Sequence, residues 1–381
     1  MSDLLRSRPA STAEMMAVFS DQSTLRHALA FEAALAAAEA EESVIAVEMA
    51  EAIIASCRAI AIDPMALAEE AALAGTLAIP LVKRLRATLP PQGAGKVHHG
   101  ATSQDMADSI LMLQTRDAAA LLLRDAGRIC DALASLAQRH AATPAIGRTL
   151  LQDAIPVGFG LRLAQAAKGI DEARSRLAAD VATFARLQFG GAAGTRAGLH
   201  GKGCSIAERM AQELGLASAE PWHARRVGTA AIATGIGILI GSVAKLARDI
   251  SLLAQNTVGE AREPVIAGRG GSSAMAHKRN PTGCQVALAA AARAPGLVSA
   301  ILGAMAQEEE RGLGGWQAEG PVIADLFLIA AGALAAMATV AEGLDIDEGA
   351  IAANLSRADV GMDIGESEAI VTALLKRQNQ E

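Results

Sequence analysis

The residues best suited to chemistry gather in one glycine-rich, polar stretch between Gly268 and Pro281, set between long alanine-rich segments. Three glycines, Gly268, Gly270 and Gly271, relax the restraints on the backbone and expose amide N–H groups, and hydroxyls and cations follow them closely. This composition is typical of a mobile loop that embraces an anion. A solvated interhelical loop is the commoner fate of such a cluster, and composition alone favours it. A phosphate-binding P-loop is excluded because no Gly-Lys-Ser/Thr follows the glycines at the required spacing.

A second polar cluster, from His98 to Asp105, stands immediately before a long apolar pattern. The spacing of Thr102 and Asp105 is that of a capping box, so the cluster predicts the start of a helix. Hydroxyls and amides at such a start lie at the positive end of the helix dipole, where a carboxylate is stabilised. The cluster is therefore both a predicted helix cap and a candidate anion site.

These clusters must be positioned by helices, because apolar residues recur at three- and four-residue spacing and no alternating β-branched pattern competes. Residues 12–60 read as helices, and prolines at 64, 80, 90 and 91 then mark a region of shorter helices that ends near residue 100. Prolines are sparse beyond that point, and long helices are predicted over residues 104–140, 154–187, 222–260, 283–311 and 320–343. Strands should be few and short, and residues 344–381 should be helical.

Composition limits the partners of the protein. The 381 residues are 51 % hydrophobic but only 2 % aromatic, with many alanines, so closely packed helices are expected. A net charge of −7 argues against nucleic acid and against an anionic membrane surface. The uncharged segment Val227 to Ala244 could span a membrane by length, but glycines and hydroxyls dilute it, and a helix at the centre of a soluble bundle is favoured.

The cysteines and the N-terminus point to the cytoplasm. The four cysteines form no CxxC pattern, so neither a zinc site nor a disulfide framework is predicted, and free thiols in a reducing compartment are expected. The first nine residues lack the apolar core of a signal peptide.

The glycine-rich stretch resembles the signature loop of the fumarase/aspartase superfamily, Gly-Ser-Ser-x-Met-Pro-x-Lys-x-Asn-Pro, and only Ala276 departs from it. The earlier cluster is similar to the superfamily's His-x-Gly-x-Thr-Ser-x-Asp element, in the right order along the chain. The resemblance extends from about residue 14 to about residue 375. It implies an all-α, long-helix bundle: an N-terminal helical domain (residues 1–100), a central bundle (101–343) and a short remnant of the C-terminal domain (344–381).

A third segment, from Gly147 to Pro156, resembles the family's Gly-Arg-Thr-x-x-Gln element, in which a polar helix start completes the pocket. Carbon–nitrogen lyases of the superfamily have a catalytic histidine where this chain has Leu150, which cannot transfer a proton. In the branch of bacterial 3-carboxy-cis,cis-muconate cycloisomerases that position is apolar and a histidine follows three residues later, where this chain has Asp153. Asp153 could be catalytic, or it could be a first-turn acid stabilised by a helix dipole.

The resemblance also implies roles for individual residues. Ser272 would transfer the proton, while Lys278 and Asn280 would hold the carboxylate that gains charge. The substrate-binding residues implied are His98, Thr102, Ser103, Arg148, Thr149, Gln152, Ser273, Met275 and Arg311. Other polar residues have simpler interpretations: His223 is expected to pack at a helix start.

The shared chemistry of the superfamily is proton transfer at the carbon α to a carboxylate, through a dianion that preorganised donors and cations stabilise. The expected reaction is lactonisation of 3-carboxy-cis,cis-muconate to 4-carboxymuconolactone in protocatechuate degradation, without metal or organic cofactor. The expected assembly is a homotetramer with active sites shared between subunits. Three alternatives stay open: a cycloisomerase for another substituted muconate, a carbon–nitrogen lyase similar to adenylosuccinate lyase, and a non-catalytic structural relative.

Overall fold

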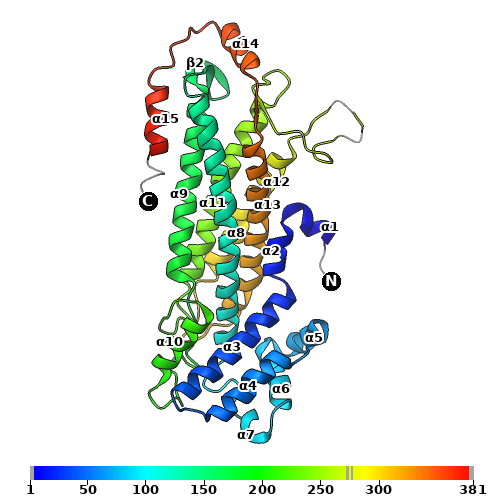
Figure 1. Cartoon of the computed structure of the whole chain (residues 1–381), viewed down its shortest axis with the longest axis vertical. Coiled ribbons are helices and arrows are strands. Elements are labelled where there is room, and N and C mark those ends of the chain that lie inside the picture. The colour runs from blue at the N-terminus through cyan, green and yellow to red at the C-terminus, as the bar shows by residue number, and fades with distance from the viewer. Residues whose placement is uncertain (1–3, 272–273, 276–277, 377–381) are drawn as a thin grey trace.

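Long helices running side by side form the body of the molecule in the computed structural model, which describes residues 4–271, 274–275 and 278–376 (Figure 1). Five long helices of this described part form the bundle: α8 (Ser103–Arg139), α9 (Phe159–Phe184), α11 (Val227–Leu253), α12 (Thr282–Gly303) and α13 (Gly315–Glu342). The five predicted long helices are thus confirmed. The largest error is at the end of the fourth, which was predicted to reach residue 311, whereas α12 ends at Gly303. At the start of the second, residues 154–158 belong to a strand.

The bundle helices pack in a closed order, α8 on α9, α9 on α11, α11 on α12, α12 on α13 and α13 back on α8. Small side chains let the backbones approach, as the composition predicts. At Gly160 of α9, for example, an added Cβ would lie 2.1 Å from the carbonyl oxygen of Ala137 in α8. Buried alanine, leucine and isoleucine side chains fill the space between the helices.

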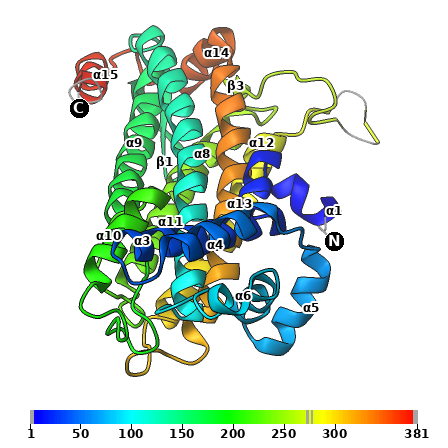
Figure 2. The ribbon, with the colours of Figure 1, turned by 60° about the horizontal axis from the view of Figure 1, so that its bottom comes forward.

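The N-terminal residues cross one end of this bundle, as Figure 2 shows. After α1 (Leu4–Ser7), a 3₁₀ turn η1 (Arg8–Ala10) and α2 (Ala13–Val18), the long helix α3 (Asp21–Glu41) packs on α8 and is followed by α4 (Val47–Ala59), α5 (Pro64–Ala74), α6 (Ala78–Ala87) and α7 (Pro91–Ala94). We call this the lower end of the bundle, as drawn in Figure 1. The expected domain boundaries at residues 100 and 343 fall between elements of the structure.

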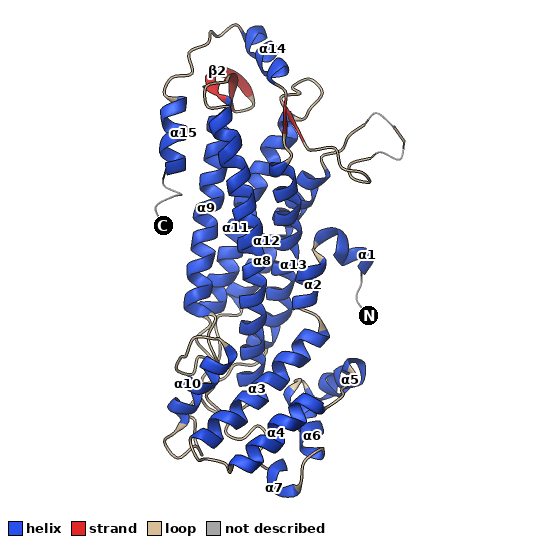
Figure 3. Cartoon of the chain, viewed as in Figure 1, coloured by secondary structure: helices blue, strands red, loops and turns tan. Residues whose placement is uncertain are grey.

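Strands are few and short among the described residues, as predicted, and lie at the upper end (Figure 3). An antiparallel hairpin joins β1 (Pro144–Thr149) to β2 (Gln152–Gly158), and a second small sheet pairs β3 (Ala261–Arg262) with β4 (Asp345–Ile346). The chain then forms α14 (Glu348–Ala358), which contacts β1, and α15 (Ser367–Lys376), which packs along α9. A further helix, α10 (Gly203–Leu214), lies against α3 near the lower end.

Three described helices, α11, α12 and α13, are long and apolar enough to cross a membrane by length and composition. All three are bundle helices, and the most apolar windows of α11 and α13 are 50 % and 61 % buried inside the fold. Their hydropathy is accounted for by packing against one another, as expected for the segment from Val227 to Ala244. The corresponding window of α12 is only 22 % buried.

Candidate active site

The lower-end cluster forms where α8 begins. The carboxylate of Asp105 accepts the backbone N–H of Thr102 at 2.9 Å, so the expected cap is present. Arg311, from the connection between α12 and α13, donates from Nη1 to the hydroxyl of Thr102 at 2.7 Å and from Nε to the amide oxygen of Gln104 at 3.4 Å. The structure therefore brings together two predicted substrate-binding residues, Thr102 and Arg311, that are more than 200 positions apart.

Asp105 has a structural part in this cluster. It is fully buried, and besides Thr102 it accepts the backbone N–H groups of Gly190 and Gly191, both at 2.9 Å. His223 Nε2 lies 2.7 Å from Oδ1 of Asp105, the oxygen that also accepts Gly190. Asp105 thus ties the start of α8 to two distant loops, and His223, which was expected to pack at a helix start, is buried there.

His98 lies beside this helix start in the left-handed backbone region, with φ of 62°. Its Nδ1 is 2.6 Å from the buried carboxylate of Glu32. Burial disfavours the imidazolium, but the hydrogen bond and negative charge of Glu32 outweigh it and raise the pKa of His98 above its ordinary value. His98 is therefore held in one orientation by an acid that supports its protonated form.

A cavity of about 350 Å³ opens beside His98 and Ser103. Lys83 and Arg86, one turn apart on α6, line it together with the apolar side chains of Ala78, Ile79 and Val82. No acid lines this cavity among the described residues, although the chain as a whole is acidic. Sequence reasoning did not select Lys83 or Arg86, because neither residue lies in one of the three polar motifs.

The segment from Gly147 to Pro156 is the β1–β2 hairpin at the upper end, so its expected helix start is wrong. Thr149 pairs with Gln152, and the two residues between them, Leu150 and Leu151, both have positive φ and form the turn. Leu150 is 95 % exposed. Asp153 belongs to β2, and its interpretation as a first-turn helix acid is wrong for the same reason; its catalytic role stays a prediction.

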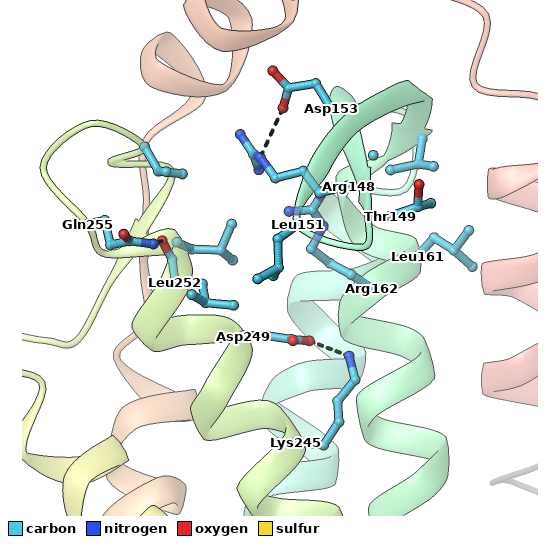
Figure 4. Close-up of a pocket in the computed structure, with 14 residues that line it drawn as sticks. Arg148, Thr149, Leu151, Asp153, Leu161, Arg162, Lys245, Asp249, Leu252 and Gln255 are labelled. Atoms are coloured by element: carbon cyan, nitrogen blue, oxygen red, sulfur yellow. Dashed lines mark hydrogen bonds and ion pairs between the residues drawn. The ribbon is translucent and has the colours of Figure 1, made fainter.

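A cavity of about 680 Å³ lies between this hairpin, α9 and the C-terminal half of α11 (Figure 4). Arg148 and Asp153 face it with Nε and Oδ1 3.4 Å apart, and Arg162, Lys245 and Asp249 are its other charged lining residues. Thr149 lines the cavity as well, whereas Gln152 is exposed at the hairpin. Both terminal nitrogens of Arg148 donate to the carboxylate of the buried Glu260, which sequence reasoning missed.

The glycine-rich stretch projects from the upper end (Figure 1). Its base is closed by Asn280, whose backbone N–H donates to the carbonyl of Gly270 at 2.8 Å and whose amide donates to Gly271 at 3.2 Å. Gly270 has φ of 75°, and a Cβ there would lie 2.7 Å from the Asn280 carbonyl, so this position requires glycine. Met275 and Lys278 are exposed. Ser272 and Ser273 lie outside the described residues, as do Ala276 and His277.

The candidate residues therefore lie at the two opposite ends of the helix bundle of one chain. The 37 residues of α8 separate the lower-end cluster from the hairpin, and a helix of that length spans about 55 Å. The glycine-rich stretch joins α11 to α12 at the upper end, with Arg311 at the far end of α12. A single chain does not gather His98, Thr102 and Arg311 with the hairpin and the glycine-rich stretch. Among the described residues no group of His, Cys, Asp or Glu could hold a metal ion.

The five-helix bundle and the three polar motifs at its ends define a lyase of the fumarase/aspartase type. The chain belongs to the lyase family, whose members it matches over residues 8–296. It is 46 % identical over 375 residues to the 3-carboxy-cis,cis-muconate cycloisomerase of Pseudomonas aeruginosa, covering 97 % of this chain and 81 % of that relative.

Solved structures agree with this family assignment. The crystal structure of 3-carboxy-cis,cis-muconate lactonizing enzyme from Pseudomonas putida superposes with a TM-score of 0.89 at 38 % identity, covering 99 % of this chain and 88 % of that one. Fumarate lyase from Mesorhizobium sp. BNC1 follows with a TM-score of 0.83 at 30 % identity, covering 96 % of this chain and 86 % of that one. The all-α fumarase/aspartase fold expected from the motifs is thus confirmed.

Proposed function

We propose that the protein is a 3-carboxy-cis,cis-muconate cycloisomerase, an intramolecular lyase that forms 4-carboxymuconolactone. The observation that carries this proposal is the likeness to a cycloisomerase of that name over 97 % of the chain. The exposed Leu150 at the hairpin turn supports it further, because a carbon–nitrogen lyase of the superfamily would present a catalytic histidine there. Protocatechuate degradation is the pathway in which this reaction belongs.

The chemistry requires donors for a carboxylate that gains charge. One carboxylate oxygen of the substrate adds to a carbon of a double bond, and the displaced electron pair moves onto the neighbouring carboxylate to give a dianion. Ser272 then delivers a proton to the carbon that lies between the attacked carbon and the carboxylate that gained charge, and the serine is reprotonated from solvent. Lys278 and Asn280 stabilise the dianion. Thr102, Ser103 and Arg311 hold another carboxylate at the start of α8. Metal ions and organic cofactors have no part in these steps.

The proposed assembly is a cytoplasmic homotetramer whose active sites are shared between subunits. The separation of the motifs along α8 supports sharing, since residues at opposite ends of one chain can meet only if copies pack against one another. An apolar groove of about 550 Å³ between α11 and α12 supports assembly. Ile238 of α11 lines it together with Val298 and Leu302 of α12, the helix whose apolar window is poorly buried. Packing of bundles from several copies would cover this face.

The test is the ultraviolet absorbance of 3-carboxy-cis,cis-muconate after addition of the purified protein. Lactonisation removes one double bond from the conjugated diene, so absorbance should fall with the wild type and with Ser218→Ala, an exposed serine outside the motifs. It should not fall with Ser272→Ala. Turnover by Ser272→Ala at the wild-type rate would overturn the role of that serine. A wild-type protein that leaves this substrate intact but cleaves adenylosuccinate would overturn the proposed function.

A further inference from the structure

Glu260 lies one residue before β3 and is fully buried at the upper end of the bundle. Its two carboxylate oxygens accept N–H groups from three different elements. Arg148 of β1 donates from Nη1 at 3.0 Å and from Nη2 at 2.6 Å, and Asn354 of α14 donates its amide at 2.8 Å. Arg162 of α9 donates from Nη1 at 3.5 Å. One carboxylate therefore joins the hairpin to α9 and α14.

The charges around Glu260 are unbalanced without it. Burial lowers the pKa of Arg162, and the positive charge of Arg148 lowers it further, while Glu260 opposes both effects. The hydrogen bonds of Glu260 raise the pKa of Arg148. Without this carboxylate two guanidinium groups would face each other at a buried site, and the hairpin arginine, which is the more exposed of the two, would be driven outward.

Glu260 leaves part of the Arg148 guanidinium available. This group has five N–H donors, and Glu260 accepts one from each terminal nitrogen. The Nε side faces Asp153 at 3.4 Å, and the Asp153 side chain is 60 % exposed at the mouth of the 680 Å³ cavity. The edge of the guanidinium formed by Nη1 and Nη2, which we call its inner face, is thus fixed by the buried Glu260. The Nε edge, its outer face, meets the exposed Asp153, which another carboxylate can replace.

We propose that Glu260 is the positioning residue for this end of the site: it fixes Arg148 through the inner face, so that the outer face takes a carboxylate of the substrate in the cavity. This inference rests on the proposed function, because it assumes a polycarboxylate substrate. Glu260 does not touch the substrate and acts through Arg148. The short segment that contains it also holds Glu263, which accepts the backbone N–H groups of Gly283 and Cys284 at 3.0 and 2.8 Å at the start of α12.

The chain offers a matched control in Asp125. This buried acid of α8 also lies between two arginines, accepting from Arg124 Nε at 3.1 Å and from Arg128 Nη1 at 3.0 Å, and it lines neither the hairpin cavity nor the cavity beside His98. Asp125→Asn and Glu260→Gln each replace a buried carboxylate by its amide between two guanidinium groups. Both should lower the melting temperature, but only Glu260→Gln should affect substrate binding.

The experiment measures kcat and KM on 3-carboxy-cis,cis-muconate for wild type, Glu260→Gln, Arg148→Ala, the double variant and Asp125→Asn. Glu260→Gln should raise KM about 10- to 100-fold, the range expected for loss of a charge-assisted contact. Glu260→Asp, which keeps the charge, should recover part of it. The double variant should be no worse than Arg148→Ala, because both changes remove the same contact. The inference would be overturned if Glu260→Gln had the wild-type KM. It would also be overturned if adding Glu260→Gln to Arg148→Ala raised KM by the same factor as Glu260→Gln raises it alone.

Hydrogen–deuterium exchange separates this inference from the proposed function. Amides of residues 144–158 should exchange faster in Glu260→Gln and remain at the wild-type rate in Asp125→Asn. If the wild type does not lactonise the substrate, the proposed function fails, and the exchange result still decides whether Glu260 fixes the hairpin. Unchanged exchange in Glu260→Gln would refute positioning whatever the activity.

Discussion

Replacing Arg226 by methionine removes the only cation from a buried cluster that joins α8, α13 and the start of α11 in the described structure. Arg226 is 1 % exposed, and its guanidinium donates to Asp108 at 2.8 and 2.9 Å and to Glu319 at 2.8 Å. It also lies 4.7 Å from the centre of the Trp222 ring. Both acids are almost wholly buried, so the substitution leaves two carboxylates without their cation inside the bundle.

The cost follows from that burial. Removing one partner of a buried ion pair destabilises a protein by about 3–5 kcal/mol, because the remaining charge stays desolvated. The matched control is Arg225→Met, which changes the adjacent, exposed arginine, whose guanidinium donates to the backbone carbonyls of Glu220 and Pro221. The control should cost less than about 0.5 kcal/mol.

The cost should also depend on pH, with a definite sign. Burial already raises the pKa of Glu319 above its ordinary value, and loss of the Arg226 charge should raise it further. A raised carboxyl pKa means that the folded protein binds protons more readily than the unfolded chain. The contribution of Glu319 to the free energy of unfolding of the variant should therefore be highest at low pH and fall as pH rises from the unfolded pKa of about 4.3 to the folded pKa, by up to about 1.4 kcal/mol per pH unit.

Urea unfolding followed by circular dichroism at 222 nm, at one chain concentration, measures both effects. The deficit of Arg226→Met relative to wild type should be smaller at pH 5 than at pH 8. An Arg226→Met protein as stable as Arg225→Met, or a deficit that is the same at both pH values, would refute the reasoning.

Three further outcomes are expected. Asp153→Asn should lower KM by about 2- to 5-fold at unchanged kcat, because an exposed ion pair with Arg148 competes weakly with the substrate; a collapse of kcat in the same kinetics would instead assign proton transfer to Asp153. Lys83→Ala should raise KM by about 2- to 5-fold, since Lys83 lines the cavity beside His98, whereas Lys168→Ala on α9 should leave KM at the wild-type value. A disulfide reagent at pH 8 should modify the exposed Cys204 rapidly and the three buried cysteines only after denaturation. The reason is that burial raises the pKa of each of the three buried thiols to about 12. Rapid modification of a second thiol in the folded protein would contradict this.

The long helices could be predicted because their limits follow from local chemistry: prolines are sparse along them, and Thr102 and Asp105 cap the longest. The β1–β2 hairpin could not be predicted in the same way. Its turn is formed by Leu150 and Leu151, which adopt the left-handed region without the glycine or asparagine that usually signals such a turn. The apolar residues that follow then extend the helical pattern of α9 backward into β2.

Site residues could be predicted where a motif is continuous in sequence, as it is around Thr102 and in the glycine-rich stretch. Contacts between distant segments carry no such signal. Glu260 meets Arg148 across 112 positions, and Lys83 reaches the cavity beside His98 from a separate helix. Only the fold reveals which isolated charges are paired. Only the fold shows that the motifs of one chain lie at opposite ends of its helix bundle.

The most direct test of the account is lactonisation by a mixture of two inactive variants. Lys278→Ala removes a cation before the start of α12 at the upper end, and Arg311→Ala removes one beyond the far end of that helix, at the lower end. Each variant alone should turn over 3-carboxy-cis,cis-muconate far more slowly than wild type. Co-expressed in one cell, the two should form mixed assemblies in which some sites combine an intact Lys278 with an intact Arg311 from different subunits, and activity should exceed the sum of the separate variants. Activity no greater than that sum, in assemblies shown to contain both chains, would contradict a site shared between subunits.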